Sequence, residues 1–176
     1  QDLTYPVVVK PLHGAGSQEI RMIDSSDSLT DLPRGEQDRV EEFCPGIPAS
    51  VSVLCGPNGH IVLPAVSQRL STDGAFRYLG GTLPLSSELT DRATNLAVAV
   101  TRARPLTVGY IGIDIVLAED RDGSDVVIEV NPRLTTSYVG LRELATCNLA
   151  QAMLDVAQGN TPHLSFGRGP LEFQSD

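Results

Sequence analysis

Three polar side chains stand at alternate positions where a run of β-branched residues ends. In the stretch VVIEVNPRL, residues 126–134, these are Glu129, Asn131 and Arg133. Side chains two apart on a strand share a face, so the three would project together as far as the strand continues. Pro132 cannot donate to a sheet ladder, which predicts a strand end or an edge here. A carboxylate and an amide oxygen suit a hard cation, and the guanidinium suits an anion beside it. A solvated strand end is the alternative.

A fourth polar side chain, Asp114, interrupts the apolar stretch GYIGIDIVLAED. A carboxylate between isoleucines is costly unless it is paired or binds a metal. The polar turn EDRDGSD follows and predicts a hairpin whose register brings Asp114 near Glu129 and Asn131. Neighbouring carboxylates raise each other's pKa, and a divalent cation removes that penalty. The three oxygen donors therefore predict a magnesium site that keeps positions for water and phosphate. An edge strand with its polar face in water is the alternative.

A glycine-containing loop follows the first apolar run, in VVVKPLHGAGS. Lys10 stands at the end of the expected strand, and Gly14, Gly16 and the hydroxyl of Ser17 follow it. Glycines let backbone N–H groups approach a phosphate closely, and the lysine adds a mobile positive charge. The lysine precedes the glycines and no helical pattern follows, so this is not a Walker P-loop. A glycine hairpin beside a surface lysine is the alternative.

An acidic strand leads into a turn in RVEEFCPGIPASVSVL, with Glu41 and Glu42 at its end. A strand edge can offer backbone groups to an adenine, with a nearby acid facing a sugar or an amine. From composition alone, a solvated acidic edge explains the stretch better. The three histidines are scattered and show no catalytic pairing, and the three cysteines show no CxxC motif. The sequence therefore favours neither a zinc site nor a disulfide framework.

The composition is that of a globular protein without a strong affinity for polyanions. The 176 residues are 41% hydrophobic, enough for one domain with a full core or two small lobes. Thirteen basic against 22 acidic residues give a formal charge of -9, which argues against nucleic acid or an anionic membrane as partner. No apolar stretch approaches the roughly 20 residues of a membrane span. A cytoplasmic location is expected. The chain starts at Gln1 and enters a strand almost at once, so we expect a missing N-terminal part.

Alternation and helical spacing predict a mixed α+β chain without a regular βαβ period. One helix is expected near residues 87–104, capped by Ser86 or Ser87 and ended by Pro105. A second helical region is expected from about 139 to 158, with a break and restart at Asn148. The tail from 161 is expected to be irregular. Expected strands are 7–10, 17–23, 40–43, 50–55, 60–66, 111–117 and 125–130, with hairpins at GPNGH and EDRDGSD that make the sheet largely antiparallel.

The order of these features resembles the ATP-grasp superfamily. The resemblance runs from VVVKPLHGAGS to about Gly159 and is most specific in DIVL followed by IEVNPRLTTSYVGLREL. That stretch and SQRLSTDGAFRYLGGTLP are similar to the carboxylate-amine ligase branch, which contains archaeal-type tyramine-glutamate ligases. The fold so implied is an α+β ATP-grasp fold with largely antiparallel sheets and flanking helices, without the usual N-terminal domain. Its expected parts are a small lobe with a glycine-rich lid at 1–46, a large lobe with the metal site at 47–160, and a C-terminal tail at 161–176.

The resemblance implies an ATP-dependent ligase that joins a carboxylate to an amine through an acyl phosphate. Arg133 would face the transferring phosphate, and Asp114, Glu129 and Asn131 would bind Mg²⁺, with Mn²⁺ as an alternative ion. Lys10 would hold the ATP phosphates. The other implied ATP-binding residues, in the lid and along the adenine, are His13, Gly14, Ala15, Gly16, Ser17, Glu41, Glu42, Phe43 and Cys44. The implied partners are a small carboxylate and a small amine, and a homodimer is one open oligomeric state.

Two departures from the family pattern affect what the resemblance implies. Many relatives have a glutamate that contacts the ribose in the hairpin after the acidic strand, whereas this chain has Pro48 and Ala49 there. Compared with the family, we also expect the usual N-terminal domain and the start of the ATP lobe to be missing from this sequence. A catalytically silent nucleotide-binding module and a small-metabolite kinase therefore stay as alternatives, and neither substrate can be identified. The segment TTSYVG after Arg133 could contact substrate or cap a helix.

Overall fold

The chain folds into two compact units, each described here by itself. A computed structural model describes residues 3–13, 19–26, 28, 38–103, 108–119 and 123–174. Unit 1 comprises residues 1–45 and 69–79, and unit 2 comprises residues 46–68 and 80–176. None of the helices in the described part of the chain is long and apolar enough to cross a membrane.

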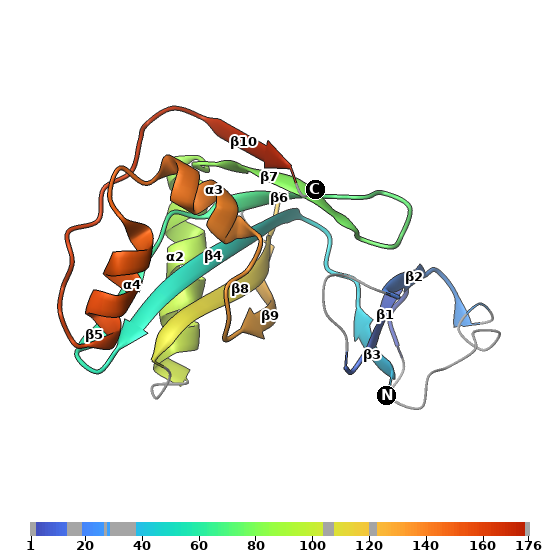
Figure 1. The fold of residues 1–176 in the computed structure, drawn as a ribbon. Helices are drawn as coiled ribbons and strands as arrows, with labels where there is room; N and C mark the ends of the chain where they lie inside the picture. Colours follow the sequence, from blue (N-terminus) through green and yellow to red (C-terminus); the bar gives the residue numbers. More distant parts are fainter. Residues whose placement is uncertain are drawn as a thin grey trace. The chain divides into compact units, whose positions relative to one another are not determined.

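Unit 2 is built around a seven-stranded sheet in which all described pairings are antiparallel. Its strand order is β10-β7-β6-β4-β8-β9, with β5 paired to β4 (Figure 1). The hairpin turns GPNGH and EDRDGSD account for the β4–β5 and β8–β9 pairs, as expected from the sequence. The strands are β4 (Ile47–Gly56), β5 (Gly59–Val62), β6 (Val66–Leu70), β7 (Tyr78–Leu83), β8 (Gly109–Leu117), β9 (Val126–Asn131) and β10 (Leu171–Gln174).

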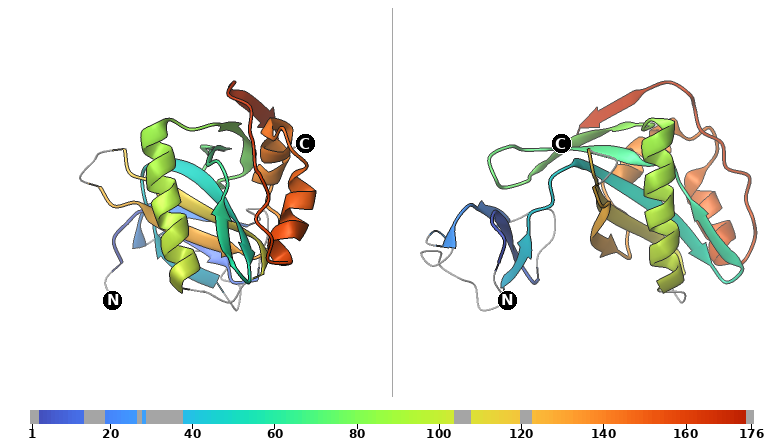
Figure 2. Two further views of the ribbon diagram at one scale, coloured as in Figure 1. Left: turned by 90° about the vertical axis from the view of Figure 1, so that its left-hand side faces the viewer. Right: turned by 180° about the vertical axis from the view of Figure 1, so that it is seen from behind.

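Helices cover both faces of this sheet. In the left view of Figure 2, α2 (Ser87–Ala103) lies on one side, and α3 (Ser137–Leu144) and α4 (Leu149–Ala157) lie on the other. Ser86 begins α2, because its Oγ accepts the backbone N–H of Leu89 at 3.4 Å. Asn148 begins α4 in the same way, with Oδ1 accepting the N–H of Gln151 at 3.0 Å. The expected helix starts at Ser86 and Asn148 are therefore confirmed.

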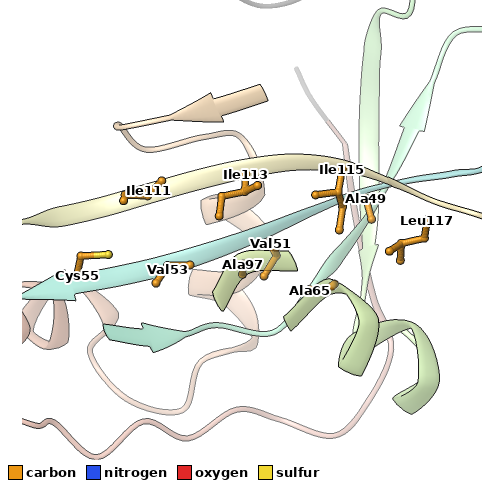
Figure 3. Close-up of a cluster of buried hydrophobic side chains, with 11 residues drawn as sticks. Ala49, Val51, Val53, Cys55, Ala65, Ala97, Ile111, Ile113, Ile115 and Leu117 are labelled. Carbon is orange, nitrogen blue, oxygen red and sulfur yellow. The ribbon is translucent and has the colours of Figure 1, made fainter. Parts of the chain in front are cut away.

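The sheet separates two hydrophobic clusters because alternate residues of β4 and β8 face opposite sides. The first cluster fills the space under α2, where Val51, Val53, Ile113 and Ile115 meet Ala97 (Figure 3). The second cluster contains Leu54, Leu83, Leu141 and Val156 and packs against α3 and α4. The long strands β4 and β8 therefore form the rigid centre of the sheet. On the face covered by α3, side chains can reach a ligand only beyond the edge of the second hydrophobic cluster.

Unit 1 contains a three-stranded antiparallel sheet in the order β2-β1-β3. Its strands are β1 (Val7–Pro11), β2 (Arg21–Ile23) and β3 (Asp38–Glu42). The connection between β6 and β7 belongs to this unit. Met22 donates its backbone N–H to Gly74 at 2.9 Å, and Phe76 stacks on Phe43 with ring centroids 6.0 Å apart.

Several expected elements differ from the structure. The expected strand 60–66 is wrong, since β5 ends at Val62 and β6 begins at Val66. β7 was not expected. The tail was expected to be irregular, but Leu171–Gln174 pairs with β7 as β10. Phe173 of β10 packs in the second cluster, which gives this short segment an apolar anchor.

Candidate functional site

The β8–β9 hairpin brings the expected metal ligands together. Asp114 of β8 lies directly opposite Glu129 of β9, and Gly112 lies opposite Asn131. The register expected from the EDRDGSD turn is thus confirmed. β9 ends at Asn131, directly before Pro132, as the missing N–H of proline requires.

A β-bulge at Ile128 sets which face the carboxylate takes. Val127 pairs with Ile115, but Glu129 pairs with Asp114, so Ile128 is the extra residue on β9. Val127 consequently packs against the cluster under α2, whereas Glu129 lies on the other face with Asp114. Without the bulge, two residues that stand two apart on a strand would have shared a face.

The side-chain amide of Asn131 joins the two carboxylates. Its Nδ2 donates to Asp114 Oδ2 at 3.1 Å and to Glu129 Oε2 at 3.2 Å. Two anionic oxygens therefore converge on one point, which is now taken by the positive end of an amide dipole. Rotation of this amide by 180° would present Oδ1 to the same point.

Asp114 is the most strongly perturbed of these groups. Burial raises the pKa of its carboxyl above the usual value, Gln68 opposes this by hydrogen bonding, and the charge of Glu129 adds to it. Gln68 of β6 donates Nε2–H to Asp114 Oδ1 at 2.8 Å. The fully buried hydroxyl of Ser50, opposite Asp114 on β4, also favours the charged form and so lowers the pKa, although no hydrogen bond of ordinary geometry joins the two.

The donor set fits a hard divalent cation. Two carboxylate oxygens and one amide oxygen can face a single point, and oxygen-only ligation with few protein donors is the usual mode of Mg²⁺. The fit depends on the asparagine, because no described group of three or more His, Cys, Asp or Glu side chains is arranged to hold a metal. A cation there would also remove the repulsion between the two carboxylates.

Arg133 lies just beyond the end of β9, on the surface. Its backbone N–H bonds to the carbonyl of Asn131 at 2.8 Å, which folds the chain back after the strand. The guanidinium donates to the carbonyl of Leu134 at 3.2 Å, and its charge lowers the pKa of Asp114. It is thus an exposed cation close to the paired carboxylates.

Lys10 and Glu41 form an ion pair inside unit 1. Lys10 Nζ lies 2.6 Å from Glu41 Oε2, and Arg39 Nε lies 2.5 Å from Glu41 Oε1. Two cations therefore share one carboxylate at the end of the β1–β3 pair. Lys10 is therefore held in place by Glu41 in the described structure.

The remaining expected ATP-binding residues are only partly described. Gly14, Ala15, Gly16 and Ser17 lie outside the described residues. His13 and Glu42 are exposed.

Phe43 and Cys44 lie in the irregular segment after β3. The backbone N–H of Phe43 bonds to the carbonyl of Pro6 at 3.1 Å, and the Cys44 thiol points to the carbonyl of Glu42 at 3.8 Å. The amide of Phe43 is therefore already satisfied within unit 1, and an adenine edge would need other backbone groups of this stretch.

A polar cavity of about 720 Å³ lies on the α2 side of unit 2, away from the paired carboxylates. Its lining includes Glu88, Asp91, Arg92 and Asp125. Arg92 binds Asp125 through two guanidinium nitrogens, which lowers the pKa of that carboxyl. Arg92 and Asp125 neutralise each other's charge. We therefore assign this cavity no role in the chemistry of the paired carboxylates on the other face of the sheet.

The comparison with known families decides the classification. A sequence model described as an ATP-grasp domain matches residues 1–137, which is most of the chain. The chain belongs to the ATP-grasp family. The resemblance that the residues around Asp114 and Glu129 indicated is therefore confirmed.

Known ATP-grasp proteins resemble this chain over less than half of their own length. A tyramine–L-glutamate ligase of Methanocaldococcus jannaschii is 29% identical over 147 residues, which cover 84% of this chain and 44% of the relative. The ADP complex of an N5-carboxyaminoimidazole ribonucleotide synthetase matches with a TM-score of 0.77 at 17% identity, covering 94% of this chain and 44% of that one. An L-amino acid ligase of Bacillus licheniformis matches with a TM-score of 0.72 at 23% identity, covering 89% and 40%. The two solved structures establish the ATP-grasp fold of this chain.

Sequence reasoning missed two side chains beside Asp114. Gln68 of β6 donates to Asp114, and Ser50 of β4 lies opposite it. The available indication was Ser50 and Ser52 at alternate positions of an otherwise apolar strand, which marks a polar stripe on one face. In the structure this stripe continues to Tyr110, whose hydroxyl lies 2.5 Å from Ser52 Oγ.

Proposed function

We propose that this ATP-grasp chain contains the ATP-binding and catalytic residues of a Mg²⁺-dependent ligase that joins a carboxylate to an amine. The observation that carries the proposal is the convergence of Asp114 and Glu129 on the amide of Asn131, with an arginine just beyond. A module that only bound adenine would have no need of two facing carboxylates, whose repulsion destabilises the free protein.

In this proposal Asp114, Glu129 and Asn131 would hold the cation, Mg²⁺ or Mn²⁺. When bound there, the cation would supply neutralisation of the charge that develops on the transferring phosphoryl group. Asp114 and Glu129 would fix its place with their carboxylates, and Asn131 could offer its amide oxygen after rotation. Arg133 serves as the catalytic cation for the departing charge, because it is exposed and its guanidinium is bonded, among the described residues, to the carbonyl of Leu134 and to no carboxylate.

Unit 1 has proposed nucleotide-binding residues of its own. Lys10 offers positive charge to the nucleotide phosphates, and Gly14–Ser17 act as the lid. Glu41–Cys44 runs along the adenine. The proposed lobes are a small lobe with a glycine-rich lid at 1–46 and a large lobe with the metal site at 47–160, followed by a C-terminal tail at 161–176; in the structure, residues 69–79 also belong to unit 1.

The proposed reaction proceeds in two steps. A carboxylate oxygen of the acid attacks the γ-phosphorus of ATP, ADP leaves, and an acyl phosphate forms. The amine nitrogen then attacks the acyl carbon, inorganic phosphate leaves, and the nitrogen loses a proton as the amide forms. Positioning and charge stabilisation accelerate both steps, so no covalent protein nucleophile is needed.

The substrates are proposed from the relatives. The tyramine–L-glutamate ligase is named for an amine and an amino acid, and the L-amino acid ligase for amino acids. We propose an amino acid as the activated acid and a small amine or a second amino acid as the acceptor. A homodimer and a cytoplasmic location remain predictions, of which the first is testable by light scattering.

Calorimetric titration with a non-hydrolysable ATP analogue, with and without Mg²⁺, tests the site. Glu129→Gln removes one charge at nearly constant volume, so it should abolish the Mg²⁺-dependent part of binding while the protein stays folded. Asp91→Asn is the matched control, because Asp91 is an exposed acid on α2. Equal losses in both variants, or no binding by the wild type, would reject the nucleotide site.

Trapping with hydroxylamine tests the chemistry. With ATP, Mg²⁺ and mixed amino acids, a ligase should form an acyl hydroxamate and release phosphate. A stable phosphoester would instead identify a kinase. Binding without phosphate release under any acid and amine combination would identify a silent module.

A further inference from the structure

Gln68 contacts the proposed metal site from a strand that supplies none of the proposed metal ligands. It lies on β6, whereas Asp114 lies on β8 and Glu129 and Asn131 on β9. Val66 of β6 pairs with Ser50 of β4, and Ser50 pairs with Asp114, so these side chains share one face of the sheet. Gln68 stands two residues after Val66 and therefore lies on the same face.

The two oxygens of Asp114 have different partners. Oδ1 accepts the Nε2–H of Gln68 at 2.8 Å, and Oδ2 accepts the Nδ2–H of Asn131 at 3.1 Å. Asn131 Nδ2 also donates to Glu129 Oε2, so Oδ2 is the Asp114 oxygen that shares a donor with Glu129. Because Gln68 is uncharged, its hydrogen bond occupies Oδ1 without adding a positive charge that would repel the cation.

We propose that Gln68 is a positioning residue that keeps Asp114 a one-oxygen ligand and thereby selects Mg²⁺ over Ca²⁺. The inference rests on the proposed function, namely that Asp114, Glu129 and Asn131 hold a divalent cation. Mg²⁺ requires near-octahedral ligation at short distance and takes single carboxylate oxygens. Ca²⁺ accepts seven or eight ligands and often takes both oxygens of a carboxylate. An amide fixed on Oδ1 hinders the second mode.

The backbone supports this selective role. β4 and β8 are paired along nearly their whole length, and Asp114 of β8 is largely buried with Ser50 of β4 on one side and Glu129 of β9 on the other. The carboxylate can therefore change its ligation mainly by rotating its terminal group, which is the motion that the Gln68 hydrogen bond restrains. Partners that orient a ligand typically change metal affinity by about 10-fold to 100-fold when they are removed.

The test is metal competition measured by electron paramagnetic resonance. Mn²⁺ binding to the full chain is followed with a non-hydrolysable ATP analogue present, and Mg²⁺ or Ca²⁺ is added as competitor. Gln68→Met keeps the length of the side chain and removes the donor. Gln151→Met is the matched control, because Gln151 likewise donates Nε2–H to an aspartate, Asp155 Oδ1, at 2.9 Å on exposed α4. The ATP analogue also binds metal without the protein, and this background is the same for every variant.

We expect Gln68→Met to weaken Mg²⁺ roughly 10-fold and Ca²⁺ less than about twofold, which shifts the preference toward Ca²⁺. Gln151→Met should leave the preference unchanged. A preference unchanged in Gln68→Met, or equal weakening of both ions, would overturn the inference while leaving the metal site intact. Failure of the wild type to bind Mn²⁺ would reject the proposed function itself. If Gln68→Met does not fold, Gln68→Asn withdraws the amide by one methylene and should give the same shift.

Discussion

Asp114→Asn should make the metal-free protein more stable while destroying its proposed metal site. The carboxylate of Asp114 is largely buried and faces a second carboxylate. Because Asp114 Oδ2 and Glu129 Oε2 bond to the same nitrogen at 3.1 and 3.2 Å, these oxygens are at most about 6.3 Å apart. Two unit charges at that distance repel by roughly 2 to 3 kcal/mol at an effective dielectric constant of about 20.

The net gain is smaller than this repulsion. Glu129 is exposed, so water screens the pair to about 1 kcal/mol. Removing the buried charge adds a few kcal/mol. The amide oxygen that Asp114→Asn introduces can accept from only one of Asn131 and Gln68, and the other amide must turn its own oxygen toward the new NH₂, so the two changed hydrogen bonds subtract about 1 kcal/mol each. We expect Asp114→Asn to raise the free energy of unfolding by about 1 to 2 kcal/mol at neutral pH.

The stability difference between Asp114→Asn and wild type should change with pH in a definite direction. The pKa of Asp114 is raised in the folded protein from the ordinary 3.8, so folding is favoured by the protonated form. That contribution is complete below about pH 4 and is lost as the pH rises through the raised native pKa. The advantage of Asp114→Asn over wild type should therefore be small at pH 4 and grow toward pH 8.

Urea unfolding of both proteins in metal-free buffer at pH 4, 6 and 8 measures this difference. Asp91→Asn serves as control, because an exposed acid should show no such trend. If Asp114→Asn were less stable than wild type at pH 8, or the difference did not change with pH, the two carboxylates would not repel as inferred. In calorimetry, the same variant should lose Mg²⁺-dependent nucleotide binding.

Three further predictions concern other parts of the chain. Lys10→Met should weaken ATP more than adenosine in calorimetry, because only the phosphates need its charge, and equal weakening would contradict a phosphate role. Asp125→Asn should lower the melting temperature, because pairing with Arg92 lowers the pKa of Asp125 below the ordinary 3.8 in the folded protein; the loss should be full above about pH 4 and disappear as the pH falls through the lowered native pKa. A pH-independent loss would point to packing instead. Gly140→Val should lower the free energy of unfolding in urea by roughly 1 to 3 kcal/mol, because a Cβ there would lie 2.4 Å from a ring carbon of Phe173. No effect would mean that β10 moves to make room for the side chain.

The parts of the site that sequence predicted are those set by local rules. The EDRDGSD turn and the two-residue alternation sufficed to pair Asp114 with Glu129 and Asn131, because a hairpin joins neighbours in the chain. Asn148 restarted a helix because capping needs only the next few residues.

The parts that sequence did not predict depend on distant pairing. Gln68 reaches Asp114 across β4, and its role follows only from the order β6-β4-β8. Likewise, β10 exists because Leu171–Gln174 finds β7, nearly ninety residues earlier in the chain. No local pattern in the sequence of the tail predicts this pairing.

The bulge at Ile128 decides which changes in β9 the proposed metal site would survive. Deletion of Ile128 would make the strand regular while Val127 stays opposite Ile115 and Glu129 stays opposite Asp114. If Ile128 stayed and the pairing became regular, Glu129 would instead lie opposite Ile113, and every later residue of β9 would change face. Glu129 and Asn131 would then point under α2, where a hydrophobic cluster would surround the charge. The extra residue is therefore compatible with the proposed site only as a bulge.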